Sequence, residues 1–507
     1  MGATPFADNV LTDRLLRSWL RCRRKAWLDC HGDADERHWT AHRNLLLDNQ
    51  QRCFIALLTD KPGHGEAACA AGQEGVVGLR LKGPGPSGER LEAHPPLLIR
   101  VNGQSRWGAF AYQPVLARQG RRMTREHQLS LALMGHLLEQ YQQGPVPELL
   151  VIGGGGRPLE QDRIKLTSGL RKQLYKALRK LRIDLARPQP PPLAADRRKC
   201  TLCGWKESCN RIAVTNGHLS EVSGIGSKRQ DILQKLGINA LKDLALADPD
   251  WLTTQMERHG EHQGKVARTL VAQAIVQCDG RAERLGLSPA LPELDSAPGV
   301  LLYDIESDPD VGHDFLHGFL RLPRQSDDQW DLAVASYCPL LVLAEHGEHS
   351  SWSRLQRLLN RYEGWPILHY GETETISLRR MAHSQGASDT QLGRLERRLI
   401  DVHARIRSHW RLPLSSYGLK SVAAWRGFSW KQTRVDGARS LLWWRQWLGE
   451  GPERRGSLHN LGWIFAYNRD DCLATWTVAA WLLEQDRLLH RHQQPAGRDS
   501  KAGRELS

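Results

Sequence analysis

The sequence predicts a multidomain α/β protein, and three observations lead to this fold class. The chain has 507 residues, enough for about three domains, and 40% of them are hydrophobic, so it can bury several cores. Strand-like and helical apolar stretches alternate from residue 299 to 490, as in a mixed α/β domain. Proline- and glycine-rich segments divide the rest. We therefore expect domains at residues 1–215, 216–280 and 299–490, a linker at 281–298 and a disordered polar tail at 491–507.

The charge balance favours a polyanionic partner. The chain has 70 Lys and Arg against 56 Asp and Glu, a formal net charge of +14, which suits nucleic acid. No apolar run approaches the roughly 18 residues that a membrane span needs, and residues 1–20 lack the apolar stretch of a signal peptide. We expect a cytoplasmic protein without membrane contact, whose ten cysteines are thiols or metal ligands.

Four cysteines of the first domain are arranged as metal ligands. Cys200, Cys203 and Cys209 form a C-x2-C-x5-C pattern, which places three sulfur atoms on one short segment. Cys22 is the best fourth ligand because its basic neighbours favour the thiolate form, and Cys30 is the reserve. Coordination chemistry alone permits either a zinc ion or an iron-sulfur cluster.

This arrangement resembles the RecB-type, PD-(D/E)XK nuclease family, over about residues 10–212. The resemblance implies a restriction-endonuclease-like lobe in which the four cysteines hold a 4Fe-4S cluster, with Zn²⁺ as the alternative. The family's active site needs an Asp and a D/E-x-K pair, but residues 97–118 contain no Asp, Glu or Lys. We expect a degenerate lobe that keeps its cluster and basic surface. A displaced active site is the alternative.

Residues 219–238 match the helix-hairpin-helix pattern of DNA repair and replication proteins. Gly224 and Gly226 permit a tight turn whose backbone N–H groups face a phosphate, and Lys228 and Arg229 add positive charge. Such a contact would not depend on base sequence. An interdomain spacer is the alternative.

Two acidic motifs in the last domain predict a metal centre. Residues 300–307 read as an apolar strand in which Asp304 and Glu306 are two residues apart, so both side chains face the same way. About 160 residues later, Tyr467 and Asp471 are predicted to open an apolar helix in the pattern Y-x-x-x-D. Clustered carboxylates repel one another unless divalent cations neutralise them.

A further acidic motif is expected between these two in the sequence. Residues 368–374 follow an apolar strand and precede a helix, and Glu374 is the predicted ligand there, with Glu372 as the competing assignment.

The three motifs resemble those of the DnaQ-like exonucleases of the ribonuclease H fold, in the subgroup that carries a tyrosine in its third motif. That family usually has Asp where this chain has Glu374. The resemblance implies two Mg²⁺ or Mn²⁺ ions held by four carboxylates, with Tyr467 orienting the attacking water. Residues 413–420 resemble an element of the RecB-associated branch, which implies that Lys420 contacts the substrate backbone; a surface lysine is the alternative. The implied ligands are Asp304, Glu306, Glu374 and Asp471.

Together these elements resemble a bacterial family of RecB-like nucleases with a fused exonuclease domain. The function implied is a metal-dependent 3′–5′ exonuclease on single-stranded DNA ends, with the iron-sulfur lobe and the hairpin engaging DNA. The alternative is a non-catalytic nucleic-acid-binding protein with a structural metal cluster. A helicase is a candidate partner that the sequence does not identify, and polarity and the choice of DNA over RNA depend on the resemblance alone.

Overall fold

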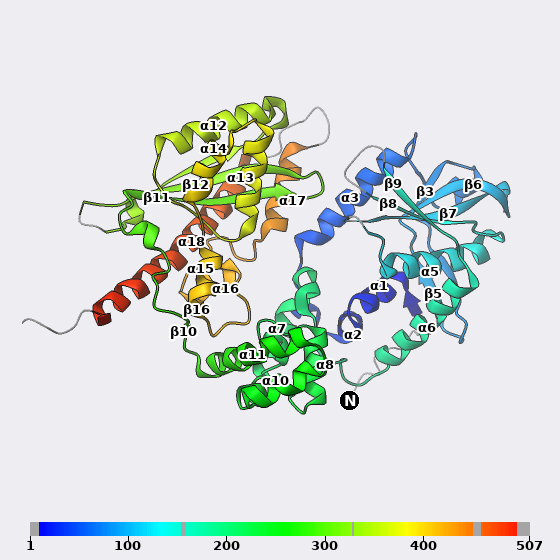
Figure 1. Ribbon diagram of the computed structural model, residues 1–507. Coiled ribbons are helices and arrows are strands. Elements are labelled where there is room, and N and C mark those ends of the chain that lie inside the picture. The colour runs from blue at the N-terminus through cyan, green and yellow to red at the C-terminus, as the bar shows by residue number, and fades with distance from the viewer. Residues whose placement is uncertain are drawn as a thin grey trace, which may run out of the picture. The chain divides into compact units, whose positions relative to one another are not determined.

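The computed structural model has two compact units, shown in Figure 1. One contains the described residues up to Asn216 together with Pro309–Val311, and the other contains the rest from Gly217 onward. None of the helices in the described part of the chain is both long and apolar enough to cross a bilayer. The tail expected at 491–507 lies outside the described residues from 494 onward. The structure describes residues 10–118, 120, 122–153, 159–326, 329–449 and 458–493.

The first unit is built on two sheets. The larger has the strand order β2 (Gly63–His64), β3 (Gly75–Val77), β6 (Leu97–Ser105), β7 (Gly108–Arg118), β8 (Leu149–Gly153) and β9 (Glu160–Ile164). The smaller has the order β1 (Val10–Thr12), β5 (Arg90–Ala93) and β4 (Leu81–Pro84). The helices are α1 (Asp13–Arg21), α2 (Arg23–His31), α3 (Ala41–Leu57), α4 (Gly65–Ala70), α5 (Arg125–Gln142), α6 (Ser168–Leu185) and α7 (Lys206–Thr215).

Helix α5 lies at the centre of this unit's core. The Thr124 hydroxyl caps its start by accepting from the His127 N–H, and Gln143 ends it in the left-handed conformation, with φ of 53°. Leu129, Leu133 and Leu137 are fully buried, because they recur at the spacing of one helical face.

The second unit begins with a small helical module. It contains α8 (Ser227–Lys235), α9 (Leu241–Ala245), α10 (Pro249–Glu257) and α11 (Glu261–Asp279) around their own apolar core. Gly237, with φ of 85°, turns the chain between α8 and α9.

A five-stranded mixed sheet carries the rest of the second unit. Its order is β13 (Ser336–Leu341), β12 (His313–Pro323), β11 (Gly299–Asp308), β14 (Ile367–His369) and β15 (Leu399–Asp401). Strands β11, β12 and β13 are antiparallel, whereas β14 and β15 run parallel to β11. The helices are α12 (Gly347–Arg361), α13 (Glu372–Ser384), α14 (Asp389–Arg398), α15 (Val402–His409), α16 (Leu419–Trp425), α17 (Gly437–Leu448) and α18 (Leu458–Gln493).

The alternation of β11 assigns each face of this sheet to different helices. Leu301 and Tyr303 pack in the core formed with α12, α13 and α14, whereas Val300 and Leu302 pack in the core formed with α18. Figure 1 shows α18, in orange to red, on the opposite face from α12 and α14. Asp304 and Glu306 continue the series of Val300 and Leu302, so they face α18.

Two elements differ from the sequence-based expectation. Helix α18 begins at Leu458 instead of at Tyr467, so Tyr467 lies well inside the helix. The segment expected to be a linker is packed on the domain: β10 (Glu283–Arg284) pairs with β16 (Trp410–Arg411), and Ala290 and Leu291 are buried. Its prolines indicated irregular backbone, but its apolar side chains still find a core.

Candidate active site

Three carboxylates meet where β11 passes α18. Asp304 and Glu306 project from one face of the strand, and Asp471 projects from the helix that packs on that face. Ligand oxygens of the three residues all lie within 4.8 Å of one another. Glu306 and Asp471 are buried, and Asp304 is half-buried. This spacing allows the group to hold a divalent cation, which prefers carboxylate oxygens.

Burial raises the pKa of each of these carboxyl groups, and repulsion from neighbouring carboxylates adds to it. The pKa values of Asp304 and Glu306 lie well above the usual range, first because of burial and then because of the neighbouring Asp471. Burial is also the main reason that the pKa of Asp471 is raised to about 6. A cation bound between them would stabilise the ionised forms, so the electrostatics of the group fit divalent metal ions.

Glu374, at the start of α13, lies outside the set of three carboxylates within 4.8 Å but interacts electrostatically with Asp304 and Asp471. Its side chain is buried, whereas Glu372 is exposed. Its Oε2 atom is buried with no hydrogen-bond partner among the described residues and lies 3.9 Å from His369 Nδ1. Burial raises the pKa of Glu374 to about 7, and Asp401 and Asp471 contribute repulsion. An unpartnered buried carboxylate oxygen is a further feature that fits a cation.

Tyr467 lies one helical turn before Asp471 and is 5% exposed. Burial, followed by repulsion from Asp471 and Glu306, raises the pKa of Tyr467 far above its usual value, so the phenol keeps its proton. Lys420 Nζ lies 5.1 Å from the centre of the Tyr467 ring and donates to the Val435 carbonyl. Its charge favours the ionised forms of Glu306 and Asp471, so Lys420 belongs to the surroundings of the carboxylates.

The sequence did not reveal the residues that hold Asp304 in place. Asn468 is fully buried and donates from Nδ2 to Asp304 Oδ2 at 2.6 Å, and its Oδ1 accepts from the Tyr337 hydroxyl at 2.8 Å. Gly318 pairs with Asp304 across β11 and β12, and a Cβ there would collide with the Asn468 side chain. The position of Asn468, three residues before Asp471, was the available signal for a residue on the same helical face.

A loop between α16 and α17 holds Asp471. Trp430 Nε1 donates to Asp471 Oδ1 at 2.7 Å, and the Lys431 backbone N–H donates to Asp470 Oδ2 at 2.9 Å. Nothing in the local sequence around Trp430 indicated this bond. Because Oδ1 accepts from Trp430, the orientation of the Asp471 carboxylate is fixed.

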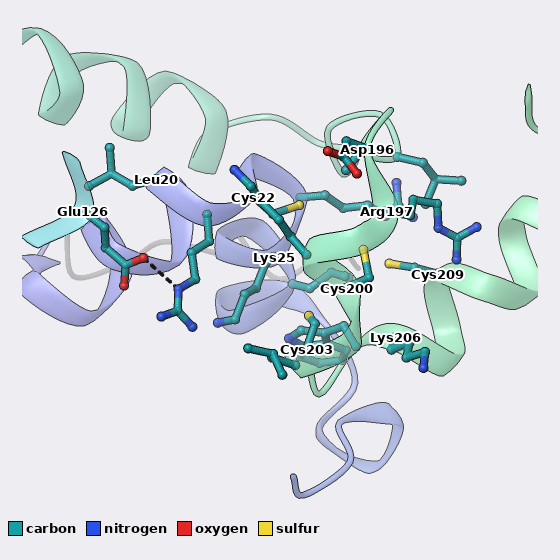
Figure 2. A pocket seen from close by; sticks show the side chains of 18 of the residues that line it. Leu20, Cys22, Lys25, Glu126, Asp196, Arg197, Cys200, Cys203, Lys206 and Cys209 are labelled. Atoms are coloured by element: carbon teal, nitrogen blue, oxygen red, sulfur yellow. Dashed lines mark hydrogen bonds and ion pairs between the residues drawn. The ribbon is translucent and has the colours of Figure 1, made fainter. Parts of the chain in front are cut away.

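The four predicted cysteine ligands line one pocket in the first unit. Cys22 separates α1 from α2, Cys200 and Cys203 lie in and just after a short 3₁₀ segment at Arg197–Leu202, and Cys209 lies on α7. The pocket has a volume of about 450 Å³, and Figure 2 shows all four side chains around it. Cys30, the reserve ligand, is exposed and is not among the lining residues.

Basic side chains surround these sulfur atoms. Burial raises the pKa values of Cys200, Cys203 and Cys209, while nearby Arg197, Lys25 and Arg24 act in the opposite direction. Cationic neighbours of this kind fit the negative charge of a thiolate-bound metal centre.

Polar contacts already join the two segments that carry the cysteines. Trp205 is 2% exposed and donates from Nε1 to Asp29 Oδ1 at 2.8 Å, while Lys25 Nζ donates to the other oxygen of Asp29 at 2.6 Å. The two ends of the first unit are therefore held together by protein contacts around the pocket.

The predicted hairpin differs in one residue from the expected phosphate contact. Gly226 precedes α8, and Gly224 is exposed with φ of 91°. Lys228 is also exposed. Arg229, however, turns back and donates to the Gly224 carbonyl at 2.6 Å and to Gln263 Oε1 at 3.0 Å. The Arg229 guanidinium therefore stabilises the hairpin through internal hydrogen bonds instead of extending away from it.

Comparison with known families agrees with the geometry of the last domain. A family model described as the RNase_H superfamily matches residues 301–483, from β11 into α18. The C-terminal domain is therefore ribonuclease H-like, and such a domain is compatible with a metal-dependent nuclease. No curated protein matches the chain.

Proposed function

We propose that the protein is a metal-dependent nuclease whose active site consists of Asp304, Glu306, Glu374, Tyr467 and Asp471. The observation that carries this proposal is the group of three carboxylates within 4.8 Å in a ribonuclease H-like domain. Magnesium or manganese ions bound there would polarise the phosphodiester and activate water.

The protein's own residues prepare this reaction. Asn468 donates to one oxygen of Asp304, and Trp430 donates to one oxygen of Asp471, which also forms a hydrogen bond with Tyr467. These neutral donors orient the two carboxylates without supplying a competing charge. Tyr467 retains its phenol proton, so it can donate a hydrogen bond to a phosphate oxygen or orient a water molecule. The positive charge of Lys420 limits the repulsion among the carboxylates before a cation binds.

The finer assignment is a 3′–5′ exonuclease on single-stranded DNA ends. Its support is the resemblance of the three motifs to the tyrosine-bearing exonucleases. Lys228 and the turn at Gly224 and Gly226 would contact the DNA backbone. Substrates labelled at the 5′ or the 3′ end test polarity, because a 3′–5′ enzyme shortens a 5′-labelled strand progressively and is stopped by a blocked 3′ end.

Substitution of Asp304 by Asn tests the active site. We expect Asp304→Asn to lower Mg²⁺- or Mn²⁺-dependent degradation of single-stranded DNA by about 100-fold or more, because a cation ligand is lost. Asp389→Asn, at an exposed carboxylate of the same domain, is the matched control and should retain activity. Unchanged degradation by Asp304→Asn would place the activity elsewhere, including in the first unit.

A second candidate function is nucleic-acid binding without catalysis. The favouring observation is that strands β6 and β7 carry no Asp, Glu or Lys, so the first unit lacks a nuclease's usual ligands there. A wild-type protein that binds DNA but degrades neither DNA nor RNA with either metal would support this function and refute the nuclease.

For the first unit we propose a 4Fe-4S cluster bound by Cys22, Cys200, Cys203 and Cys209. Its support is the resemblance carried by the cysteine spacing, together with the four side chains lining one pocket. The visible spectrum of the purified protein and its iron content provide the test. A brown protein with about four iron atoms supports the cluster. A colourless protein that contains zinc refutes it.

A further inference from the structure

An exposed aromatic surface lies on α18, about two helical turns before Asp471. Trp463 is 45% exposed, although it lies on the helix that carries Tyr467 and Asp471. Its ring centre is 5.3 Å from that of Trp443 on α17 and 6.4 Å from that of His459. We call Trp443, His459 and Trp463 the aromatic platform.

The aromatic platform differs from the other tryptophan contacts of this domain. Trp444 stacks on Phe315 with ring centres 4.6 Å apart and is only 3% exposed, so that pair serves packing. Trp463 instead leaves nearly half of its surface accessible. The exposed face of the Trp463 indole is therefore free of the packing that covers Trp444, as a ring that stacks on a base must be.

The position of Trp463 relates the platform to the active site. Trp463, Tyr467 and Asp471 are spaced by four residues, so all three lie on one side of α18. The rise of an α-helix places Trp463 about 6 Å before Tyr467 and about 12 Å before Asp471 along the axis. These separations correspond to the neighbouring nucleotides of a strand whose phosphodiester lies at the carboxylates.

Polar neighbours fix the platform and add positive charge. The guanidinium carbon of Arg439 lies 5.6 Å from the centre of the Trp443 ring, and Gln432 Nε2 donates to the Trp463 carbonyl at 3.3 Å. The flat face of a nucleobase stacks on an aromatic ring, and a nearby arginine adds a cation–π contribution and attracts phosphate.

We propose that the aromatic platform stacks an unpaired base of a single-stranded nucleic acid next to the phosphodiester that the carboxylates cleave. The proposal rests on the proposed function, which it deepens by naming the residues that bind an unpaired base of the substrate. The base must be unpaired because both faces of a base inside a duplex are covered by its neighbours. A protein ligand at this surface is the competing outcome of the test.

Binding experiments with abasic oligonucleotides test this proposal. The probe is a fluorescently labelled oligothymidylate, and the full-length protein carries Asp304→Asn in every arm, so that affinity is measured without degradation. We expect Trp463→Ala to weaken binding about tenfold, and Trp463→Phe to retain most of the affinity. In the parent protein, removing the base at one position should weaken binding by a similar factor.

The decisive result is how the two changes combine. If the base stacks on Trp463, both changes remove the same contact. Removing the base should therefore weaken the binding of the Trp463→Ala protein only slightly further. Trp251→Ala, at an exposed tryptophan of α10, is the matched control. This variant should lose as much affinity as the parent protein when the base is removed from the probe. The proposal is overturned if the parent protein does not bind the probe or if Trp463→Ala binds it as tightly as the parent. It is also overturned if removing the base weakens binding by Trp463→Ala as much as binding by the parent.

These results separate the platform from the proposed function, because degradation is measured independently with the wild-type protein. If the two losses of affinity are not additive but the wild-type protein degrades no nucleic acid, the aromatic platform is supported and the nuclease is refuted. Degradation abolished by Asp304→Asn, together with normal binding by Trp463→Ala, would retain catalysis and refute the platform.

Discussion

Gly318 is required by its neighbours and not by its backbone conformation. It lies opposite Asp304, and a Cβ at this position would collide with Asn468 Oδ1 and lie 2.9 Å from the Tyr337 hydroxyl. We expect Gly318→Ala to displace Asn468, destabilise the domain by about 1–3 kcal/mol and lower nuclease activity about tenfold or more. Thermal denaturation and metal-dependent degradation are the measurements.

The control for this prediction is a glycine in the interior of a helix. Gly393 lies on α14, where an added Cβ meets only the end of the Arg397 side chain at 3.6 Å. Gly393→Ala should therefore retain activity and raise stability by up to about 1 kcal/mol. If both variants behave alike, the packing of Asn468 does not position Asp304.

Two nearby glutamates test the assignment of the second acidic motif. Glu374 is buried beside the carboxylate group, whereas Glu372 is exposed two residues earlier. We expect Glu374→Gln to lower activity by about 100-fold, because one cation ligand loses its charge, and Glu372→Gln to retain activity. Steady-state degradation rates at saturating Mg²⁺ measure both, and the reverse result would assign the ligand to Glu372.

At the scale of single residues, local patterns identified the candidate ligands but not their supports. Asp304 and Glu306 could be predicted because alternation along one strand determines which way they face. Asn468, Gly318 and Trp430 could not, because each contact depends on how strands and loops distant in the sequence come together. The same dependence explains why Arg229 was expected to be available for phosphate but bonds to Gln263.

At the scale of elements, hydrogen bonds join the helical module to the ribonuclease H-like domain. Gln273 on α11 donates to the Leu412 carbonyl at 2.8 Å and accepts from the Tyr417 hydroxyl at 3.1 Å. The same hydroxyl accepts from the Leu412 N–H at 2.8 Å. Tyr417 thus connects α11 to the segment that leads into α16 and Lys420.

Removing this hydroxyl tests the connection. We expect Tyr417→Phe to lower the free energy of unfolding by about 1–3 kcal/mol, because the Leu412 N–H and Gln273 lose a partner in a poorly solvated place. Chemical denaturation measures the change. Tyr362→Phe is the control, since the Tyr362 hydroxyl accepts one long bond of 3.5 Å from Arg321. Equal stability of Tyr417→Phe and the wild type would refute a structural role for this hydroxyl.

Element boundaries were predictable only where the local chemistry is distinctive. The strand at β11 agrees closely with the apolar run at residues 300–307, because such a run has few alternatives. The start of α18 was placed nine residues late, although Leu458, Leu461 and Ile464 already recur at helical spacing before Tyr467. The segment 281–298 resembled a linker, since proline content does not indicate whether isolated apolar residues will be buried.

At the scale of the whole molecule, divalent metal should raise thermal stability. The carboxyl groups of Asp304, Glu306 and Asp471 have raised pKa values because burial and repulsion disfavour their ionised forms. A bound cation offsets both effects, so we expect the unfolding temperature at neutral pH to rise with Mg²⁺ or Mn²⁺ concentration. Asp304→Asn should be more stable than the wild type in a chelator and should respond less to metal. Identical responses of the two proteins would contradict this site.

His317 should contribute less to the stability of the domain as the pH falls into the mildly acidic range. This residue is 2% exposed, and burial lowers its pKa to about 4, below the value of about 6.5 for an unfolded chain. Between these values the unfolded state takes up a proton that the folded state does not, so the contribution of His317 to stability falls as the pH decreases from about 6.5 to 4. Glu374, with its raised pKa of about 7, acts in the opposite direction.

A difference measurement isolates the contribution of His317. We expect the free energy of unfolding of His317→Asn to fall less steeply than that of the wild type between pH 6.5 and 4. Asn was chosen because its side-chain oxygen can accept from the Tyr303 hydroxyl, which bonds His317 Nδ1 at 2.8 Å. Parallel pH profiles would show that His317 does not contribute.

The uninterrupted course of α18 has a mechanical consequence. The helix has 36 residues and is therefore about 54 Å long. Near its far end, Asp486 accepts from the backbone N–H groups of Ala290 and Leu291 and pairs with Arg284, in the segment that leads from the helical module. One continuous helix thus links the attachment of that segment to Asp471. A force on the segment would act on Asp471 through this helix, while the helical spacing among Trp463, Tyr467 and Asp471 would stay constant.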